Sequence, residues 1–244
     1  RDCIGALRSA ARGKLSRAMM AQLPFSLSLP PSYRREDFII GDANKDATSW
    51  IETWPDWPRP YRALNLFGPE GAGKTHLGAI WAEISGAKTY TRLIAGEKLP
   101  VTHGEAILLE ACDSGLYDEE ALFHLLNAIA EAEGSLLMLS RIPVSQIDIQ
   151  LADTRSRLRS LAAQDITSPD DQLFKAVLFK LCADRQCVVP ETVIDYLVVR
   201  IERSYHAAFQ IVAALDAEAL THKKPVTLGL ARSVLADYLA SDKA

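Results

Sequence analysis

The chain has 244 residues, 48% of them hydrophobic, and a formal net charge of −4, which is ordinary for a globular protein with a sizeable core. The acidic balance, with a pI near 5.8, excludes a general attraction to phosphate backbones. No apolar run reaches the about 18 residues needed to span a membrane. Four cysteines without a CxxC pair or nearby histidines argue against a zinc site or a disulfide framework, and we expect a cytoplasmic protein.

The N-terminal region has no sustained hydrophobic periodicity, and the prolines in LPFSLSLPPSY exclude an ordinary helix. We therefore expect residues 1–34 to form a flexible tail. Its first stretch is basic and reaches Met19 and Met20, where we expect the natural protein to start. A functional basic arm is the alternative.

Residues 35–167 alternate apolar runs with amphipathic segments, which predicts an α/β fold with a parallel sheet flanked by helices. Buried strands are expected at 63–67, 106–109 and 135–140. A helix is expected after each of the first two strands. The residues predicted to face the core are Leu77, Ile80, Trp81 and Ile84 in one helix, and Leu122, Leu125, Leu126 and Ile129 in the other.

Residues 168–244 show only helical periodicity, which predicts a small all-helical domain. Ser168 or Asp170 is expected to cap its first helix. The last helix is expected to begin near Thr227. The apolar stripes that define these helices consist of Phe174, Val177, Leu178 and Leu181, then Val193, Ile194, Leu197, Val198 and Ile201, then Ala208, Ile211, Val212 and Leu215, and finally Leu230, Val234, Leu235 and Tyr238.

The strongest motif is GPEGAGKT at 68–75, which matches the phosphate-binding pattern GxxxxGK[ST] between a predicted strand and a predicted helix. Its glycines let successive backbone N–H groups face a phosphate. Lys74 is expected to reach the outer phosphates, and the Thr75 hydroxyl to ligate Mg²⁺. A glycine-rich turn that binds nothing is the alternative. The residues expected to hold the nucleotide are Gly68, Pro69, Glu70, Gly71, Ala72, Gly73, Lys74, Thr75 and His76.

An acidic residue that helps to hold Mg²⁺ is expected at the end of a neighbouring strand, and Glu110 directly follows the strand predicted at 106–109. An exposed strand-end residue is the alternative. The next residue, Ala111, has no carboxylate to orient or activate water, and Asp113 would have to reach in from a turn. Nucleotide binding is therefore expected to be intact and hydrolysis impaired.

These motifs make the chain resemble the AAA+ nucleotide-binding proteins, and more closely their DnaA-related branch, over residues 22–240. Within that branch it is most similar to the regulatory inactivators of DnaA, the Hda family. REDFIIGDAN at 35–44 resembles the segment that wraps the adenine, which implies apolar contacts from Phe38, Ile39 and Ile40. Ordinary core packing of these three side chains is the alternative.

Three further segments support the resemblance. The first, LYDEEALFHLLN at 116–127, is very similar to the segment that follows the acidic strand in the inactivators. LSRIP at 139–143 matches the sensor 1 motif and implies that Ser140 lies beside the outer phosphate, with a turn cap as the alternative. DTRSRL at 153–158 resembles the motif that carries the arginine finger, which implies that Arg157 acts on the nucleotide of a neighbouring subunit. An interdomain or solvated ion pair is the alternative for Arg157.

RIERSYHAAF at 200–209 resembles the sensor 2 helix of the family's helical lid, but His206 stands where the initiator has an arginine. A neutral imidazole offers less permanent charge to a phosphate than a guanidinium does. Arg203 lies one turn earlier. This departure and Ala111 together imply weakened catalysis.

QLPFSL in the tail resembles the hexapeptide by which the inactivators dock on the DNA polymerase sliding clamp. An extended peptide of this kind enters a surface pocket through its side chains. The residues implied in clamp binding are Gln22, Leu23, Phe25 and Leu27.

The resemblance implies a regulator that holds ADP or ATP with Mg²⁺, docks on the clamp and promotes ATP hydrolysis by the initiator DnaA. DNA would be reached only through the clamp, because the chain ends at Ala244, shortly after the lid, without the initiator's DNA-reading domain. Self-association is left open. The alternative is an autonomous AAA+ ATPase that acts as a loader or an initiator-like motor, which would use Glu110 or Asp113 for its own hydrolysis.

Overall fold

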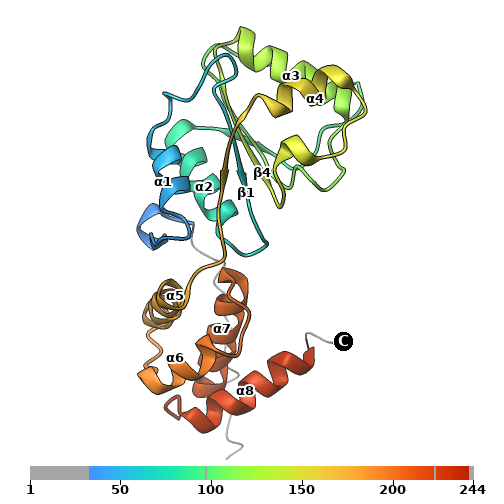
Figure 1. Ribbon diagram of the computed structural model, residues 1–244. Coiled ribbons are helices and arrows are strands. Elements are labelled where there is room, and N and C mark those ends of the chain that lie inside the picture. Colours follow the sequence, from blue (N-terminus) through green and yellow to red (C-terminus); the bar gives the residue numbers. More distant parts are fainter. Residues whose placement is uncertain (1–32, 97, 223, 242–244) are drawn as a thin grey trace, which may run out of the picture.

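The computed structural model describes residues 33–96, 98–222 and 224–241. The predicted clamp motif and almost all of the predicted tail lie outside these residues. The described chain has two parts, a sheet with helices on both faces and a bundle of helices below it (Figure 1). Within the described residues, no helix combines the length and the apolar character that crossing a membrane requires.

The first part is built on a five-stranded parallel sheet with the strand order β2-β3-β4-β1-β5. In chain order the strands are β1 (Ala63–Phe67), β2 (Lys88–Tyr90), β3 (Ala106–Leu109), β4 (Ser135–Ser140) and β5 (Ala162–Asp165). The register pairs Phe67 of β1 with both Ser140 of β4 and Asp165 of β5. The carboxyl ends of these strands therefore meet at one edge of the sheet, where ligands of open α/β sheets bind.

The three predicted strands are confirmed as β1, β3 and β4, which form the middle of the sheet. Strands covered on both faces are almost continuously apolar, and this is what the sequence displayed. Sequence reasoning missed β2 and β5. Both are short, lie at the edges and are largely exposed or half-buried, so they carry little apolar signal.

Helices cover both faces of the sheet. Helices α1 (Lys45–Glu52) and α2 (Lys74–Ser85) pack on one face, and α3 (Glu119–Glu131) and α4 (Ala152–Arg159) on the other (Figure 1). The short 3₁₀ helices η1 (Arg35–Asp37) and η2 (Val144–Gln146) complete this part. The predicted core residues of α2 and α3 are buried with one exception: Ile84, in the last turn of α2, is 57% exposed.

The second part contains α5 (Asp171–Asp184), α6 (Glu191–Val198), α7 (Tyr205–His222) and α8 (Leu228–Ser241). Their predicted stripes form one apolar core. Asp170, one of the two predicted caps, accepts a hydrogen bond from the Leu173 N–H at 2.7 Å. The predicted domain boundary at 167/168 falls between β5 and α5 and remains a prediction.

The helical part contacts the phosphate loop directly. The Tyr205 N–H at the start of α7 donates to the Gly71 carbonyl at 2.9 Å. The Tyr205 ring stacks on Phe38, with 6.5 Å between the ring centroids. Lys180 of α5 forms an ion pair of 2.7 Å with Asp37. These contacts place the lid over the carboxyl edge of the sheet.

Candidate nucleotide-binding site

The segment 68–75 forms a tight loop between β1 and α2, as its glycines require. Gly68, Gly71 and Gly73 have φ values of 150°, 72° and 102°. A Cβ on Gly68 would lie 2.0 Å from the Ile166 carbonyl oxygen, and a Cβ on Gly71 would lie 2.3 Å from the Ser204 Cβ. Only glycine satisfies both the backbone conformation and the close approach. The loop amides are thereby left at the N-terminus of α2, which favours an anion.

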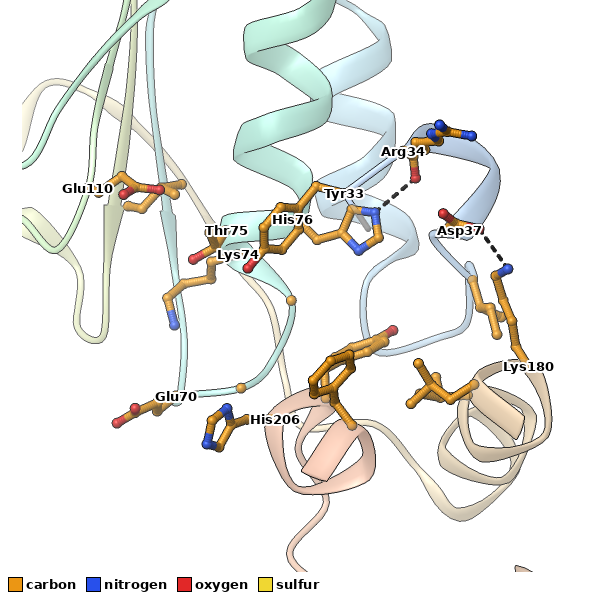
Figure 2. A pocket seen from close by; sticks show the side chains of 18 of the residues that line it. Tyr33, Arg34, Asp37, Glu70, Lys74, Thr75, His76, Glu110, Lys180 and His206 are labelled. Atoms are coloured by element: carbon orange, nitrogen blue, oxygen red, sulfur yellow. Dashed lines mark hydrogen bonds and ion pairs between the residues drawn. The ribbon is translucent and has the colours of Figure 1, made fainter. Parts of the chain in front are cut away.

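A cavity of about 1010 Å³ opens between this loop, the N-terminal segment, the ends of β3 and β4, and the lid (Figure 2). Its volume is at the upper end of the ~300–1,000 Å³ typical of small-molecule sites. It brings together most of the residues predicted for the nucleotide. Those that line it are Ile39, Glu70, Gly71, Gly73, Lys74, Thr75, His76, Glu110, Ser140 and His206.

Several other predicted nucleotide-binding residues do not line this cavity. Phe38 is 5% exposed and packs in the core beneath α2, and Ile40 is 46% exposed outside the cavity. Within the segment predicted to wrap the adenine, the residues that line the cavity are Ile39 and the charged Glu36 and Asp37. Gly68, Pro69 and Ala72 shape the loop from outside the lining.

Lys74 lies at the mouth of the loop, where its ammonium donates to the carbonyls of Gly68 and Pro69, both at 2.7 Å. Burial lowers the pKa of Lys74, while the nearby carboxylates of Asp113 and Glu70 oppose that shift. A phosphate is a stronger, charged acceptor than a carbonyl. The residues present therefore fit the phosphates of a nucleotide.

Thr75 and Glu110, the two predicted Mg²⁺ ligands, both line this cavity. Thr75 is exposed, and Glu110 is half-buried at the end of β3. No cluster of three acidic, histidine or cysteine side chains suited to a metal ion occurs in the described part of the chain. Magnesium at phosphate sites typically keeps several waters and uses one or two protein ligands beside the phosphates. Two protein ligands are compatible with that pattern.

The position after Glu110 offers no second carboxylate. Ala111 has a φ of 51°, so the chain turns sharply at the end of β3. Asp113, two residues later, does line the cavity, but its carboxylate accepts hydrogen bonds from the Arg141 backbone N–H at 3.1 Å and from Arg141 Nε at 2.6 Å. Asp113 is therefore already engaged by a cation.

Ser140 ends β4 on the cavity wall and is 1% exposed. Its hydroxyl donates to the Ile142 carbonyl at 2.6 Å and accepts from the Asn65 amide at 2.9 Å. The Asn65 side chain also accepts from the Val144 N–H at 3.0 Å. Sequence reasoning missed Asn65, although a polar residue inside the buried strand ALNLF was the available signal.

Two residues of the predicted tail also line the cavity, the aromatic Tyr33 and the basic Arg34. The His76 Nε2–H donates to the Arg34 carbonyl at 2.9 Å (Figure 2). The His76 ring has edge contacts with Tyr33 and Phe38. Burial lowers the pKa of His76, and the hydrogen bond to Arg34 opposes that shift. These residues close the side of the cavity opposite Glu110.

The sensor 2 region places His206 at the cavity, where it is exposed and lies 2.8 Å from the Gln210 side-chain amide. Arg203 does not line the cavity and pairs instead with Asp171 at 2.5 Å. The segment that leads into α7 (Tyr205–His222) therefore directs no guanidinium into the cavity.

Arg157 lies on α4, away from the cavity. Its guanidinium carbon is 4.5 Å from the centroid of the Phe123 ring of α3. Its Nη1 donates to the Tyr61 hydroxyl at 3.2 Å, the only hydrogen bond of this guanidinium within the described residues. Arg155, by contrast, donates to the backbone carbonyls of Ile149 and Gln150. Arg157 is thus held by aromatic side chains with most of its donors unused.

Comparisons with known proteins agree with this geometry. The family model described as the lid domain of Hda matches residues 170–235. The chromosomal replication initiator DnaA of Campylobacter jejuni is 25% identical over 246 aligned positions, which cover 89% of this chain and 55% of that protein. The chain therefore spans about half the length of this relative.

Among solved structures, domain III of Thermotoga maritima DnaA matches with a TM-score of 0.71 and 19% identity, over 86% of this chain and 98% of that one. A DnaA structure bound to AMPPCP and single-stranded DNA matches with a TM-score of 0.60 and 18% identity, over 80% and 69% of the two chains. These similarities show a shared fold.

The phosphate loop, the parallel sheet and the helical lid together form an AAA+ fold like that of DnaA domain III. The sequence matches are more specific than the fold: the chain is similar to the DnaA initiators over most of its length, and its lid is similar to that of Hda.

Proposed function

We propose that this chain is an adenine-nucleotide-binding regulator of replication initiation, which acts on a DnaA initiator through Arg157. Lys74 and the loop amides would hold the phosphates of ADP or ATP, and Thr75 with Glu110 would hold Mg²⁺. The DnaA relatives and the Hda-like lid support the choice of partner. The expected outcome is negative regulation of initiation.

One observation carries the proposal: Arg157 and the chain's own phosphate loop lie at opposite ends of β1. Tyr61, which accepts a hydrogen bond from Arg157, precedes the amino end of this strand, and the loop begins at its carboxyl end. A strand of five residues spans roughly 17 Å at about 3.3 Å per residue. This separation supports a role for Arg157 on a nucleotide held by another molecule.

The acidic residues of the cavity also support a chain that holds its own nucleotide and acts on a partner's. Ala111 carries no carboxylate, and Asp113 is paired with Arg141. The chain therefore has the residues that we assign to nucleotide binding. Among the described residues directly after Glu110, at the end of β3, it has no unpaired second acid. An arginine supplied to a partner's active site can increase the rate of hydrolysis by 10³–10⁵. This effect does not require turnover by the regulator itself.

Replacement of Arg157 by Ala tests the proposal. ATP hydrolysis by DnaA from the same organism is measured with and without the regulator and clamp-loaded DNA. The variant is expected to lose the stimulation, by about 10³-fold for a complete arginine finger. Arg159→Ala is the matched control because Arg159 is exposed on the same helix. Equal stimulation by wild type and Arg157→Ala would remove the assigned role.

Docking on the sliding clamp through Gln22, Leu23, Phe25 and Leu27 belongs to the same proposal, and these residues lie outside the described ones. Replacing Gln22 and Leu23 by Ala is expected to abolish retention of the protein on immobilised clamp. The melting temperature should remain nearly unchanged, because residues of a terminal tail contribute little to a core. Undiminished retention would eliminate the tail as the docking segment.

An autonomous ATPase is a second candidate, because Lys74, Thr75 and Glu110 line one cavity. It predicts brisk ATP turnover by the purified chain alone and its loss on Lys74→Ala. Absence of turnover in the wild type would favour the regulator.

A further inference from the structure

A second pocket, of about 520 Å³, lies on α1 and the turn that follows it, and it shares no lining residue with the nucleotide cavity. Its walls include Trp50, Glu52, Trp54 and Asp56. Helix α1 packs on the face of the sheet opposite α4 (Figure 1). A molecule bound in this pocket would therefore lie on the other face of the sheet from Arg157.

Two tryptophan side chains form the apolar walls of this pocket. Trp50 and Trp54 are half-buried, and both pack against the core of the sheet part. Trp54 meets the buried Trp81 edge-on, with 6.2 Å between the ring centroids, and Trp57 stacks on Trp81 at 5.3 Å. The indole face is the aromatic surface that attracts a cation most strongly. The walls are therefore suited to a cation with a flat or apolar body.

Hydrogen bonds within the turn hold these walls in place. The Trp57 Nε1–H and the Thr53 hydroxyl both donate to the Trp50 carbonyl, at 2.8 and 2.9 Å. The Asp56 N–H donates to the Thr53 carbonyl at 2.9 Å. The pocket is thus formed before a ligand arrives, and a preformed site loses less conformational entropy on binding.

Two carboxylates line the pocket, and they differ in what they contact. Glu52 forms an ion pair of 2.6 Å with Arg35 of η1. The exposed Asp56 has no side-chain hydrogen bond or ion pair within the part of the chain that the structure describes. Arg59, three residues later, pairs with Glu133 instead. One carboxylate of the pocket therefore already holds a guanidinium, and the other is available to a cation from outside.

A ligand that matches this pocket combines a positive charge for Asp56 with a flat surface for the tryptophan rings. The arginine side chain has both, because its guanidinium is planar, always charged and weakly hydrated, and it stacks on aromatic faces. It also donates two parallel N–H groups to a carboxylate. A lysine ammonium is more strongly hydrated and lacks the planar shape. Arginine is, in addition, among the residues that contribute most to protein–protein binding.

We propose that this pocket binds an arginine side chain on a segment of a partner protein. The guanidinium lies against Trp50 and Trp54 and pairs with Asp56. The site uses neither the nucleotide cavity nor Arg157, so the inference goes beyond the proposed function and does not depend on it.

The test uses a short capped peptide with a central arginine among alanines, and a counterpart in which citrulline replaces the arginine. Citrulline keeps the shape of arginine and lacks its charge. Each peptide is titrated into the isotope-labelled full chain, whose four tryptophans are read by NMR as separate indole N–H signals. The arginine peptide should shift the Trp50 and Trp54 signals saturably, and the citrulline peptide should bind about tenfold more weakly. Equal binding of the two peptides, or no shift with either, would overturn the inference.

A substitution in the pocket tests the role of the carboxylate. Asp56→Asn keeps the size of the side chain and should weaken binding of the arginine peptide about two- to fivefold, the effect of one exposed ion pair. Binding of the citrulline peptide should not change. Asp237→Asn, which removes an exposed carboxylate from α8, is the matched control and should bind both peptides as the wild type does. Unchanged affinity for the arginine peptide in Asp56→Asn would refute the pairing.

The basic segment at 1–18 of this chain, outside the described residues, is the competing occupant. A full-length variant with four of its basic residues replaced by Gln distinguishes it from a partner. With a partner as the occupant, the indole signals of the variant without peptide should match those of the wild type. Displaced Trp50 and Trp54 signals would identify this segment as the occupant and refute the partner. The replaced residues are Arg8, Arg12, Lys14 and Arg17.

Discussion

Lys74 and Arg157 lie at opposite ends of β1, and different kinds of partner hold them. The Lys74 ammonium is held by two backbone carbonyls inside a glycine-rich loop. The Arg157 guanidinium rests on the Phe123 ring and forms a single hydrogen bond, with Tyr61, among the described residues. The loop N–H groups and the Lys74 ammonium are suited to receive an anion in place, whereas the aromatic support of Arg157 leaves donors for an anion that arrives on another molecule. The residues to which we assign nucleotide binding and action on a partner's nucleotide are thus physically separate in this chain.

The largest expected effect on nucleotide affinity comes from removing the cation at the loop. Lys74→Ala should weaken binding of adenine nucleotides by at least about 100-fold, because charge-assisted hydrogen bonds to phosphates contribute about 1.5–3 kcal/mol each. Calorimetric titration with Mg²⁺-ADP measures this.

Two variants away from the phosphate loop are the controls for that titration. Arg157→Ala should bind as the wild type does, and so should Lys175→Ala, which removes a lysine paired with Glu191 and Asp195 on the lid. A comparable loss in Arg157→Ala would show that the two ends of β1 are not independent.

A smaller effect is expected from Asn65, inside the strand that separates the two ends. Asn65 is fully buried and bonds to Ser140, Met138 and Val144. Asn65→Leu should lower the free energy of unfolding by about 2 kcal/mol, because buried polar partners lose their hydrogen bonds. Urea denaturation measures the change, with the exposed Gln146→Leu as the control. Wild-type stability in Asn65→Leu would mean that this network contributes nothing.

The smallest effect is expected at the support of Arg157. Tyr61→Phe keeps the ring and removes only the hydroxyl that accepts the 3.2 Å hydrogen bond from Arg157. Stability should fall by about 0.5–1 kcal/mol, the net contribution of one hydrogen bond, and stimulation of DnaA should fall by a small factor because Arg157 is less well oriented. Nucleotide affinity should not change. Altered nucleotide affinity together with normal stimulation of DnaA in Tyr61→Phe would contradict the assignment of different roles to the two ends of β1.

The fold was predictable where the hydrophobic signal was local and strong. Strands β1, β3 and β4 are apolar runs, and the lid helices display continuous stripes, so both parts were identified from the sequence. Strand β2, Lys-Thr-Tyr at an edge of the sheet, is too short and too exposed for such a signal. Ile84 fits the periodicity of α2 yet is 57% exposed, because periodicity does not reveal where a neighbouring element ends.

The candidate site was likewise predictable only where its residues are close together in the sequence. The loop at 68–75 was predicted because its chemistry lies within one contiguous motif. The bond between Asp113 and Arg141 joins residues 28 positions apart, that between Asn65 and Ser140 spans 75, and that between Arg157 and Tyr61 spans 96. No local pattern reports such pairs. Phe38, predicted to contact adenine, lies in the core because the same apolar character serves both roles.

The sequence by itself determined that a phosphate loop follows a buried strand, that Ala111 replaces a second acid, and that a helical lid follows the sheet. These are properties of neighbouring residues, governed by backbone conformation and periodicity. Only the tertiary structure decided that Asp113 is bound to Arg141, that the lid contacts Gly71, and that Arg157 lies a strand's length from the loop. Those facts depend on parallel pairing, which brings the ends of distant strands to a common edge and separates residues that are close in sequence to opposite edges.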